Sequence, residues 1–514
     1  MCGIAGFCNF KEDFEENTDY WNFRLEKMRA VLAHRGNDAR GRYLKKHIGL
    51  SHSRLAIRDI LCGDQPMTRT HNGYDYTICY NGEIYNTDEL IPELSENGFV
   101  CSTTSDTEVI LYAYIHWGAD FVNRLNGIFA FAIWDAAKNR LLLYRDRVGV
   151  KPLFYAIRGD SLVFGSEPKA CFAHPAVKPE LDKPAHTSGL SLFKDLFEVL
   201  PGHFMIYSQD GLHDETYWEL TSREHTENYR DTVAHTRFLV EDAIKRQMVS
   251  DVPVCTFLSG GIDSSIVTAI AANYMNTRGK TLNTFSFDFK DNDRYFKANA
   301  FQPERDLPYV NRMLEEYETA HSYLECDENS LFKALFAAVD AKDMPGMTDV
   351  DSSLLYLCSL VSRKNKVALT GECADEIFGG YPWFYRKELL ERYGFPWSSD
   401  VAPRLALLRD DVGLELDLSG YQAFRYEESR SKAPLLYGET GEDESRRIIG
   451  YLNIKWFMQT LLDRMDRTSM YSELEARVPF ADHRIIEYVF NVPWHMKYQN
   501  GVEKTLLRDA FSDV

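Results

Sequence analysis

The order of strand-like and helix-like segments changes near residue 230, and this change constrains the fold more than any other feature of the chain. Before it, apolar runs at 128–134 and 140–146 flank a short polar turn. Such a pair predicts an antiparallel hairpin. Two segments with helical spacing of apolar residues, 21–32 and 107–117, interrupt the strands. Hairpins with separate helices predict an α+β domain built in layers.

A polar stretch at 208–230 separates this part from a second part, in which the segments follow a different order. After it, strand-like segments alternate with helical ones, and a β–α–β alternation predicts a parallel, doubly wound sheet. The segments in question are the helix 232–248, the strand 252–258, the helix 264–275, the strand 281–287 and a later strand at 367–370. From about residue 385 on, the pattern is mostly helical. We therefore expect two domains, 2–208 and 231–514, joined by a linker at 209–230.

Composition excludes several classes of protein. The 514 residues carry 58 Lys and Arg against 77 Asp and Glu, a net charge of −19, whereas binding to a nucleic-acid backbone requires a basic face. None of the 10 cysteines forms a CxxC pair, which fits a reducing compartment. The apolar run at 128–134 is far shorter than a membrane span, and the one at 4–7 is too short for a signal peptide. We expect a cytoplasmic protein with no nucleic-acid or membrane partner.

The segment SGGIDSS at 259–265 follows an apolar strand and opens a helix. Its two glycines let the backbone approach a ligand closely, and the helix N-terminus and serine hydroxyls offer donors to anionic oxygens. Asp263 would repel a phosphate unless a divalent cation lies between them, so the loop predicts Mg²⁺. The segment lacks the GK[ST] ending of a Walker A loop. The alternative is a glycine turn in which Ser and Asp only cap the helix.

A second loop, LTGECADE at 369–376, also follows a strand. In a doubly wound fold it would lie at the same carboxyl edge of the sheet as the first loop. Its carboxylates, Glu372, Asp375 and Glu376, are suited to bind Mg²⁺ or to orient a nucleophile. The alternative is that acidic residues stabilise a helix N-terminus, and for Glu376 that interpretation is preferred.

Cys2 follows the initiator methionine. If Met1 is removed, the α-amino group of Cys2 has a pKa of about 7.7–8.0 and is suited to act as general base for the thiol. Nucleophile and base would then share one residue. Taken alone, Cys2 is better explained as an incidental cysteine in a reduced protein.

Two sets of motifs resemble known families. The start of the chain resembles the class II glutamine amidotransferases, which use an N-terminal nucleophile; the matching segments are MCGIAG at 1–6, HRG at 34–36, SRLAI at 53–57, NGEIYN at 81–86 and SDTE at 105–108. The SGGIDSS loop resembles the pyrophosphate loop of the N-type ATP pyrophosphatases. The combination resembles the glutamine-hydrolysing asparagine synthetases over nearly the whole chain, with further agreement at 146–153, 166–170 and 474–480.

This resemblance implies an αββα N-terminal-nucleophile fold for the first domain and an ATP pyrophosphatase fold for the second. It implies a ligase that uses glutamine, aspartate and ATP. The expected reaction runs through β-aspartyl-AMP to asparagine and releases AMP, pyrophosphate and glutamate. Ammonia would pass between the sites through an internal channel. The resemblance also allows a homodimer.

The resemblance further implies a role for individual residues. Cys2 would attack the glutamine amide, Asn81 and Gly82 would stabilise the oxyanion, and Glu372 would act in the adenylate step. The residues implied to bind glutamine are Arg54, Leu55, Ala56, Ile57, Arg58, Asn81, Gly82, Glu83 and Asp106. Those implied to bind ATP and pyrophosphate are Leu258, Ser259, Gly260, Gly261, Asp263, Ser264, Ser265, Phe287, Thr370 and Gly371. Asp263 and Asp375 are the implied Mg²⁺ ligands.

Two departures from the family pattern bear on these expectations. Asn37 stands where the family often has proline. Family members also continue beyond the helix at 502–511 with a segment whose lysine neutralises phosphate charge, and we assign no residue of this chain to that place. We therefore expect the second domain to lack its C-terminal end, or its synthetase activity to be weakened.

Three alternatives remain. In the first, an enzyme with the same glutaminase and ATP-dependent sites amidates a carboxylic acid other than aspartate. A glutaminase or regulatory protein with a defective synthetase site would keep Cys2 and lose adenylation. A class II amidotransferase of sugar or purine synthesis ranks last, because it would need another module in place of SGGIDSS.

Overall fold

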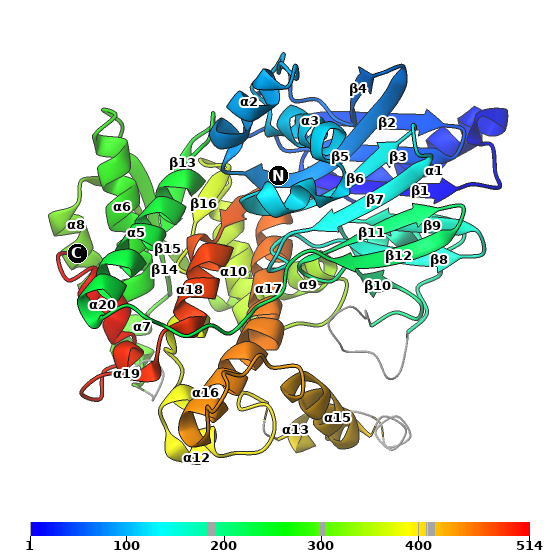
Figure 1. Ribbon diagram of the computed structural model, residues 1–514. Coiled ribbons are helices and arrows are strands. Elements are labelled where there is room, and N and C mark those ends of the chain that lie inside the picture. The colour runs from blue at the N-terminus through cyan, green and yellow to red at the C-terminus, as the bar shows by residue number, and fades with distance from the viewer. Residues whose placement is uncertain (1, 182–191, 299–303, 399, 408, 410–416) are drawn as a thin grey trace.

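The computed structural model describes residues 2–181, 192–298, 304–398, 400–407, 409 and 417–514 (Figure 1). The first domain contains two sheets whose strand pairs are all antiparallel. In spatial order, the first sheet consists of β10 (Phe197–Glu198), β8 (Phe154–Arg158), β9 (Ser161–Gly165), β1 (Cys2–Asn9), β3 (Ile48–Arg54) and β2 (Ala39–Lys45). The second consists of β12 (Gly211–Thr216), β11 (His203–Ser208), β7 (Arg140–Arg145), β6 (Gly127–Asp135), β5 (Tyr74–Ile84) and β4 (Met67–His71).

The two sheets form the middle of four layers. Ile4 and Leu50 of the first sheet pack against Ala130 and Leu143 of the second in one buried cluster. The outer face of the first sheet is covered by α1 (Thr18–Ala30) and α4 (Pro168–Phe172), and that of the second by α2 (Thr87–Glu96) and α3 (Asp106–Trp117). The predicted αββα fold is confirmed, and so are the hairpin β6–β7 and the helix at 107–117.

The linker begins later than the sequence predicts. Residues Gly211–Thr216, expected within it, form β12 and pair with β11 at the edge of the second sheet. Four of these six residues are exposed, so the strand lacks the apolar alternation that would reveal it. Its place in the sheet comes from the tight turn after β11.

The second domain contains a parallel sheet in the order β15-β14-β13-β16-β17, which confirms the predicted doubly wound fold. The strands are β13 (Val254–Phe257), β14 (Leu282–Phe289), β15 (Thr319–Cys326), β16 (Val367–Leu369) and β17 (Glu475–Arg477). Successive residues of β13 face opposite cores: Val254 packs with α5 (Tyr229–Gln247) and α6 (Ile262–Asn276), and Cys255 packs with α10 (Thr348–Val361). β17 is three residues long and lies in the part expected to be helical; it is too short to produce a pattern.

The other helices surround this sheet. They are α7 (Asn292–Tyr295), α8 (Leu307–Glu316), α9 (Glu328–Lys342), α11 (Ala374–Phe378), α12 (Lys387–Leu390), α13 (Ala402–Leu405), α15 (Leu418–Arg430), α16 (Gly441–Leu452), α17 (Met458–Met470), α18 (His483–Asn491), α19 (Trp494–Lys497) and α20 (Thr505–Ala510). Of these, α12, α13, α15 and α16 form the base of the molecule in Figure 1. Among the described residues, no helix has both the length and the apolar content needed to cross a membrane.

The two domains share buried charges as well as apolar contacts. Arg35 of the first domain lies 2.8 Å from Asp466 on α17, and Lys151 lies 2.9 Å from the other oxygen of the same carboxylate. Arg35 also pairs with Glu167 at 2.9 Å, and Arg467 approaches Glu167 to 3.5 Å. All five side chains are at most 2% exposed. We call these five residues the interface ion network.

We predict that Asp466→Asn strongly destabilises the protein, because it leaves Arg35 and Lys151 buried without their shared counter-ion. The expected loss is about 3–5 kcal/mol, the cost of breaking a buried ion pair. Thermal unfolding followed by circular dichroism measures it. As a control, Glu391→Gln removes an exposed pair with Lys387, 3.5 Å long, and should cost at most about 1 kcal/mol. Equal shifts in the two variants would contradict this role for Asp466.

Candidate active sites

The first candidate site surrounds Cys2, the first residue of β1. Its backbone N donates to Asn81 Oδ1 at 2.9 Å, and its carbonyl oxygen accepts from Arg35 Nε at 3.1 Å. These bonds hold the residue at the start of a fully buried strand. The side chain of Cys2 is itself buried, at 7% exposed.

Burial is the largest influence on the Cys2 thiol and raises its pKa, whereas the positive amino terminus and the N–H of Leu55 lower it. A buried thiol remains protonated at neutral pH and needs a base before it reacts as a nucleophile. With Met1 removed, the α-amino group of Cys2 would supply a base of suitable pKa. The surroundings of Cys2 therefore fit the predicted nucleophile.

Asn81 shows an open donor next to Cys2. Its Oδ1 is occupied by the Cys2 backbone N, while its Nδ2 is buried and has no hydrogen-bond partner within the described part of the chain. A buried donor left unpaired costs free energy that a ligand acceptor would recover. The adjacent Gly82 has no room for a side chain, since a Cβ there would lie 2.1 Å from the carbonyl oxygen of Ile128. This geometry suits an oxyanion hole.

The residues implied to bind glutamine lie in two groups. Arg54, the register partner of Cys2 on β3, donates to the carbonyl oxygens of Ile60 and Asp59 and to Asp64. Leu55, Ala56 and Ile57 follow it and are buried. The guanidinium of Arg54 thus organises the loop at 58–64 in this conformation, and a substrate carboxylate would have to share its donors.

The second group is formed by Arg58, Glu83 and Asp106. Asp106 accepts from the Tyr80 hydroxyl at 2.9 Å and from the backbone N of Ile84 at 3.0 Å. Glu83 lies 3.9 Å from Arg58, and burial together with the charge of Asp106 raises the pKa of Glu83 well above its usual range. A cationic ligand group near these two carboxylates would relieve their repulsion.

The second candidate site lies where β13 and β16 end side by side. These strands are neighbours in the parallel sheet. The next strand after β13 is β14, on one side of the pair, and the next strand after β16 is β17, on the other side. Doubly wound folds bind ligands at such a reversal of strand order. The two predicted loops meet there: a Cβ at Gly371 would lie 2.8 Å from the backbone N of Ser264 and 3.0 Å from the Cβ of Asp263. Thr370 donates its backbone N to the carbonyl oxygen of Arg477 at 3.0 Å.

The loop at 259–265 is organised by its serines. The hydroxyl of Ser264 bonds to that of Ser259 at 3.0 Å and donates to the carbonyl oxygen of Gly261 at 3.0 Å. Gly260 has a φ of 81° and packs close to the carbonyl oxygen of Asp306. Helix α6 starts after Gly261 without a side-chain cap, so its first N–H groups, with Ser265 beside them, remain available to an anion.

Leu258 and Phe287 lie beside this loop. Together with Ser259 they line a small cavity of about 20 Å³ between β14 and α8. The residues implied to surround ATP are therefore gathered at one edge of the sheet, the apolar ones on one side of the loop and Thr370 and Gly371 on the other.

Asp263 and Asp375 share one cation, which the sequence did not reveal. Lys504, at the start of α20, places its Nζ 2.7 Å from Asp263 and 2.6 Å from Asp375. The Oδ1 of Asp263 is buried without a hydrogen-bond partner in the described residues, and burial raises the pKa of this carboxyl to about 6. Two carboxylates that already hold a positive charge, one of them with an oxygen to spare, fit a Mg²⁺ site completed by phosphate oxygens and water.

Glu372 points to a different partner. Its carboxylate lies 2.9 Å from Arg464 on α17. Two residues along the same helix, Asp466 contacts Arg35, which in turn donates to the carbonyl oxygen of Cys2. One helix therefore contacts both candidate sites, and Figure 1 shows α17 in the centre of the molecule between the domains.

Comparison with known proteins agrees with the two-site arrangement. The family model described as "Asparagine synthase" matches residues 235–514, and that described as "Glutamine amidotransferase domain" matches residues 1–218. The chain is 47% identical to asparagine synthetase [glutamine-hydrolyzing] 3 of Bacillus subtilis, covering 100% of this chain and 84% of the relative. It is 30% identical to asparagine synthetase [glutamine-hydrolyzing] 1 of the same organism, with the same coverage. It is also 28% identical to amidase chyE of Penicillium rubens, covering 99% of this chain and 85% of the relative.

We predict that Lys504→Met lets the protein bind Mn²⁺ more tightly in the absence of nucleotide, by at least about tenfold, because the competing ammonium is removed from the two carboxylates. Electron paramagnetic resonance of free Mn²⁺ measures this affinity. The matched control is Lys245→Met, since Lys245 pairs with Glu241 at the surface at 2.8 Å and should leave Mn²⁺ affinity unchanged. Unchanged Mn²⁺ affinity in Lys504→Met would contradict the assignment of Asp263 and Asp375.

Proposed function

This chain belongs to the asparagine synthase family, whose members are carbon–nitrogen ligases, and we propose that it uses ATP to transfer the amide nitrogen of glutamine to aspartate. The products would be asparagine, glutamate, AMP and pyrophosphate. The observation that carries the proposal is the meeting of the loops at 259–265 and 369–376 in a chain that also holds Cys2 beside an open oxyanion donor. We assign glutamine hydrolysis to residues 2–208, extended by β12, and amidation to 231–514.

Glutamine hydrolysis would begin at Cys2. With Met1 removed, the α-amino group takes the thiol proton and the sulfur attacks the amide carbon of glutamine. Asn81 Nδ2 and the N–H of Gly82 donate to the oxyanion, the C–N bond breaks, and the proton held by the amine passes to the leaving nitrogen as ammonia forms. Water then cleaves the thioester to give glutamate. Arg54 would bind the α-carboxylate of glutamine and Asp106 its α-ammonium.

Amidation would take place at the edge of the parallel sheet. Asp263 and Asp375 would hold Mg²⁺, which neutralises charge on the departing pyrophosphate. The N–H groups at the start of α6 and the hydroxyls of Ser264 and Ser265 bind phosphate oxygens, and Lys504 adds a positive charge. A carboxylate oxygen of aspartate attacks the α-phosphorus, giving β-aspartyl-AMP. Ammonia then attacks the acyl carbon and AMP leaves, with Glu372, oriented by Arg464, accepting a proton from the nitrogen.

The ammonia must cross from one domain to the other. The shared core supports a route inside the protein, because Leu55, Ile128 and Val148 of the first domain join Met458 and Met470 of α17 in one buried apolar cluster. An apolar path keeps ammonia unprotonated and therefore nucleophilic.

A different carboxylate acceptor is the second candidate. The similarity to a relative named an amidase, over 99% of this chain, supports it. In that case the glutaminase and adenylation steps stay the same, and only the acid that becomes the adenylate changes.

Mass spectrometry of a reaction with amide-¹⁵N glutamine, Mg-ATP and aspartate tests the proposal. We expect ¹⁵N-asparagine and AMP in equal amounts. Glutamate without asparagine or AMP, together with AMP and a ¹⁵N-labelled amide when another acid replaces aspartate, would favour the second candidate. Glutamate without AMP from any acid would contradict both and indicate a glutaminase whose synthetase site is defective.

We predict that two single substitutions each remove the activity of one domain and spare that of the other. Cys2→Ala should lower glutamine-dependent synthesis by roughly a thousandfold or more, because the nucleophile is lost, while synthesis from ammonium chloride continues. Asp263→Asn should keep glutaminase activity and lose the release of AMP. Assays of glutamate and AMP on each variant measure both. Loss of both activities in either variant would contradict the division of labour between the domains.

A further inference from the structure

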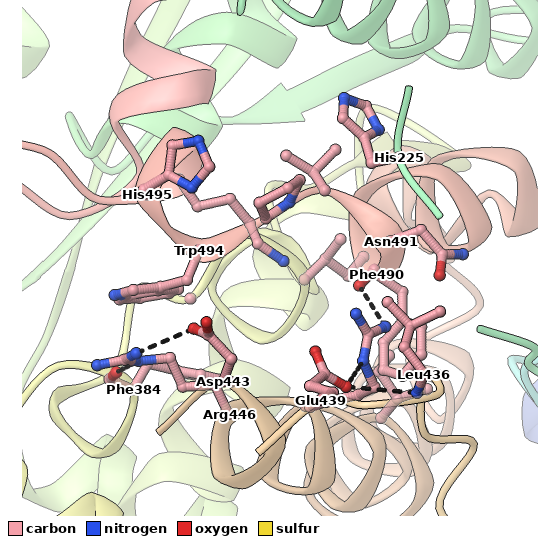
Figure 2. A pocket seen from close by; sticks show the side chains of 18 of the residues that line it. His225, Phe384, Leu436, Glu439, Asp443, Arg446, Phe490, Asn491, Trp494 and His495 are labelled. Carbon is pink, nitrogen blue, oxygen red and sulfur yellow. Dashed lines mark hydrogen bonds and ion pairs between the residues drawn. The ribbon is translucent and has the colours of Figure 1, made fainter. Parts of the chain in front are cut away.

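A cavity of about 350 Å³ lies outside both candidate sites (Figure 2). Its walls come from the end of α11, from α16, and from the segment that joins α18 to α19. None of the residues implied to bind glutamine, ATP or Mg²⁺ lines it. Its volume falls within the range of pockets that bind small molecules.

Rigid aromatic side chains form one wall. The Trp494 ring stacks on Phe384 at 6.1 Å and on Tyr498 at 5.4 Å, measured between ring centroids. Gly379, with a φ of 76°, allows this approach, because a Cβ there would lie 2.5 Å from the Trp494 ring. Phe490 and Leu436 add further apolar surface. The wall is thus prepared to cover a flat apolar group without rearrangement.

The arginines that line the cavity are already neutralised. Arg446 lies 2.6 Å from Glu442 and 3.4 Å from Asp443, and its guanidinium lies over the Trp494 ring at 5.2 Å. Figure 2 shows Arg446 beside Trp494 and bonded to Asp443. Arg447 lies 2.5 Å from Glu439. These pairs leave little charge for a ligand.

The one acidic residue of α11 that lines the cavity also has a partner. Glu376 is 3% exposed and accepts a hydrogen bond from the Tyr381 hydroxyl at 2.7 Å. Glu439 and Asp443 pair with the two arginines. Each carboxylate that lines the cavity therefore already has a partner.

Lys497 differs from all of these. Its Nζ donates to the carbonyl oxygen of Val489 at 2.8 Å, and it forms no ion pair with a carboxylate within the described parts of the chain. An ammonium has three donors, so two remain for a ligand. Burial is the largest influence on this group and lowers the pKa of Lys497 to about 7; the charge of Arg447 also lowers it, and that of Glu439 raises it. An anion bound here would supply the missing counter-charge.

We propose that this cavity binds a small monocarboxylic acid with a flat apolar body. The carboxylate would pair with Lys497, and the body would lie against Trp494 and Phe490. Amino acids fit less well, because their α-ammonium would find no unpaired carboxylate in the cavity. The site is therefore distinct from that of the aspartate or glutamine substrate. Glu376, which lines the cavity, directly follows the proposed Mg²⁺ ligand Asp375 on α11.

Isothermal titration calorimetry with phenylacetate as the probe tests this proposal on the full chain. We expect binding that phenylacetamide, which has the same shape without the charge, weakens by about ten- to a hundredfold, as for the loss of a hydrogen bond to a charged group. Lys497→Met should weaken phenylacetate binding to a similar extent, and Lys497→Arg should restore most of it.

The matched control is Lys455→Met, since Lys455 is another partly buried lysine, in the wall of a different cavity. It should leave phenylacetate binding unchanged. Thermal unfolding followed by circular dichroism, unchanged from the unmodified chain, verifies that each variant is folded. Absence of phenylacetate binding to the unmodified chain, equal binding of phenylacetamide, or equal binding by the Lys497→Met variant would each overturn the proposal.

Discussion

Charge buried between the two domains is the constraint on which the rest of the structure depends. Docking takes Arg35, Lys151 and Arg467 out of water, and the large desolvation penalty of these charges is offset only when Asp466 and Glu167 are in place. Apolar contacts tolerate small sliding movements, whereas shared carboxylates with two or three partners do not. The interface ion network therefore specifies how the domains dock.

Helix α17 lies between the docked domains because its charged residues face different partners. Residues two positions apart on a helix point in nearly opposite directions, so Arg464 and Asp466 cannot serve the same neighbour. Arg464 reaches Glu372 of the second domain, and Asp466 reaches Arg35 of the first. A helix with this alternation must lie between the two domains. Because Arg35 also donates to the carbonyl oxygen of Cys2, a continuous series of contacts joins Glu372 to Cys2 through α17.

The sequence predicted the layers, the parallel sheet and the meeting of the two loops, because each rests on a local pattern. Continuous apolar runs mark β6 and β7, and a glycine turn after an apolar run marks the loop that follows β13. β12 and β17 escaped prediction because one is mostly exposed and the other is only three residues long. The interface ion network was also invisible, since Arg35 and Asp466 are 431 positions apart and an isolated charge in a sequence indicates a surface.

The role of Lys504 at the proposed synthetase site could not be predicted from the sequence either. Its motif was recognised as a helix, yet nothing local indicates that the chain enters it through a left-handed residue, with a φ of 54° at Lys504 itself. That conformation is unfavourable for lysine and persists only where other contacts compensate, here the pairs with Asp263 and Asp375. Two carboxylates so close together are stable only with a cation between them. In this structure that cation is the ammonium of Lys504. The proposed Mg²⁺ would take its place between the carboxylates, and the charge of Lys504 would then be available to the phosphates.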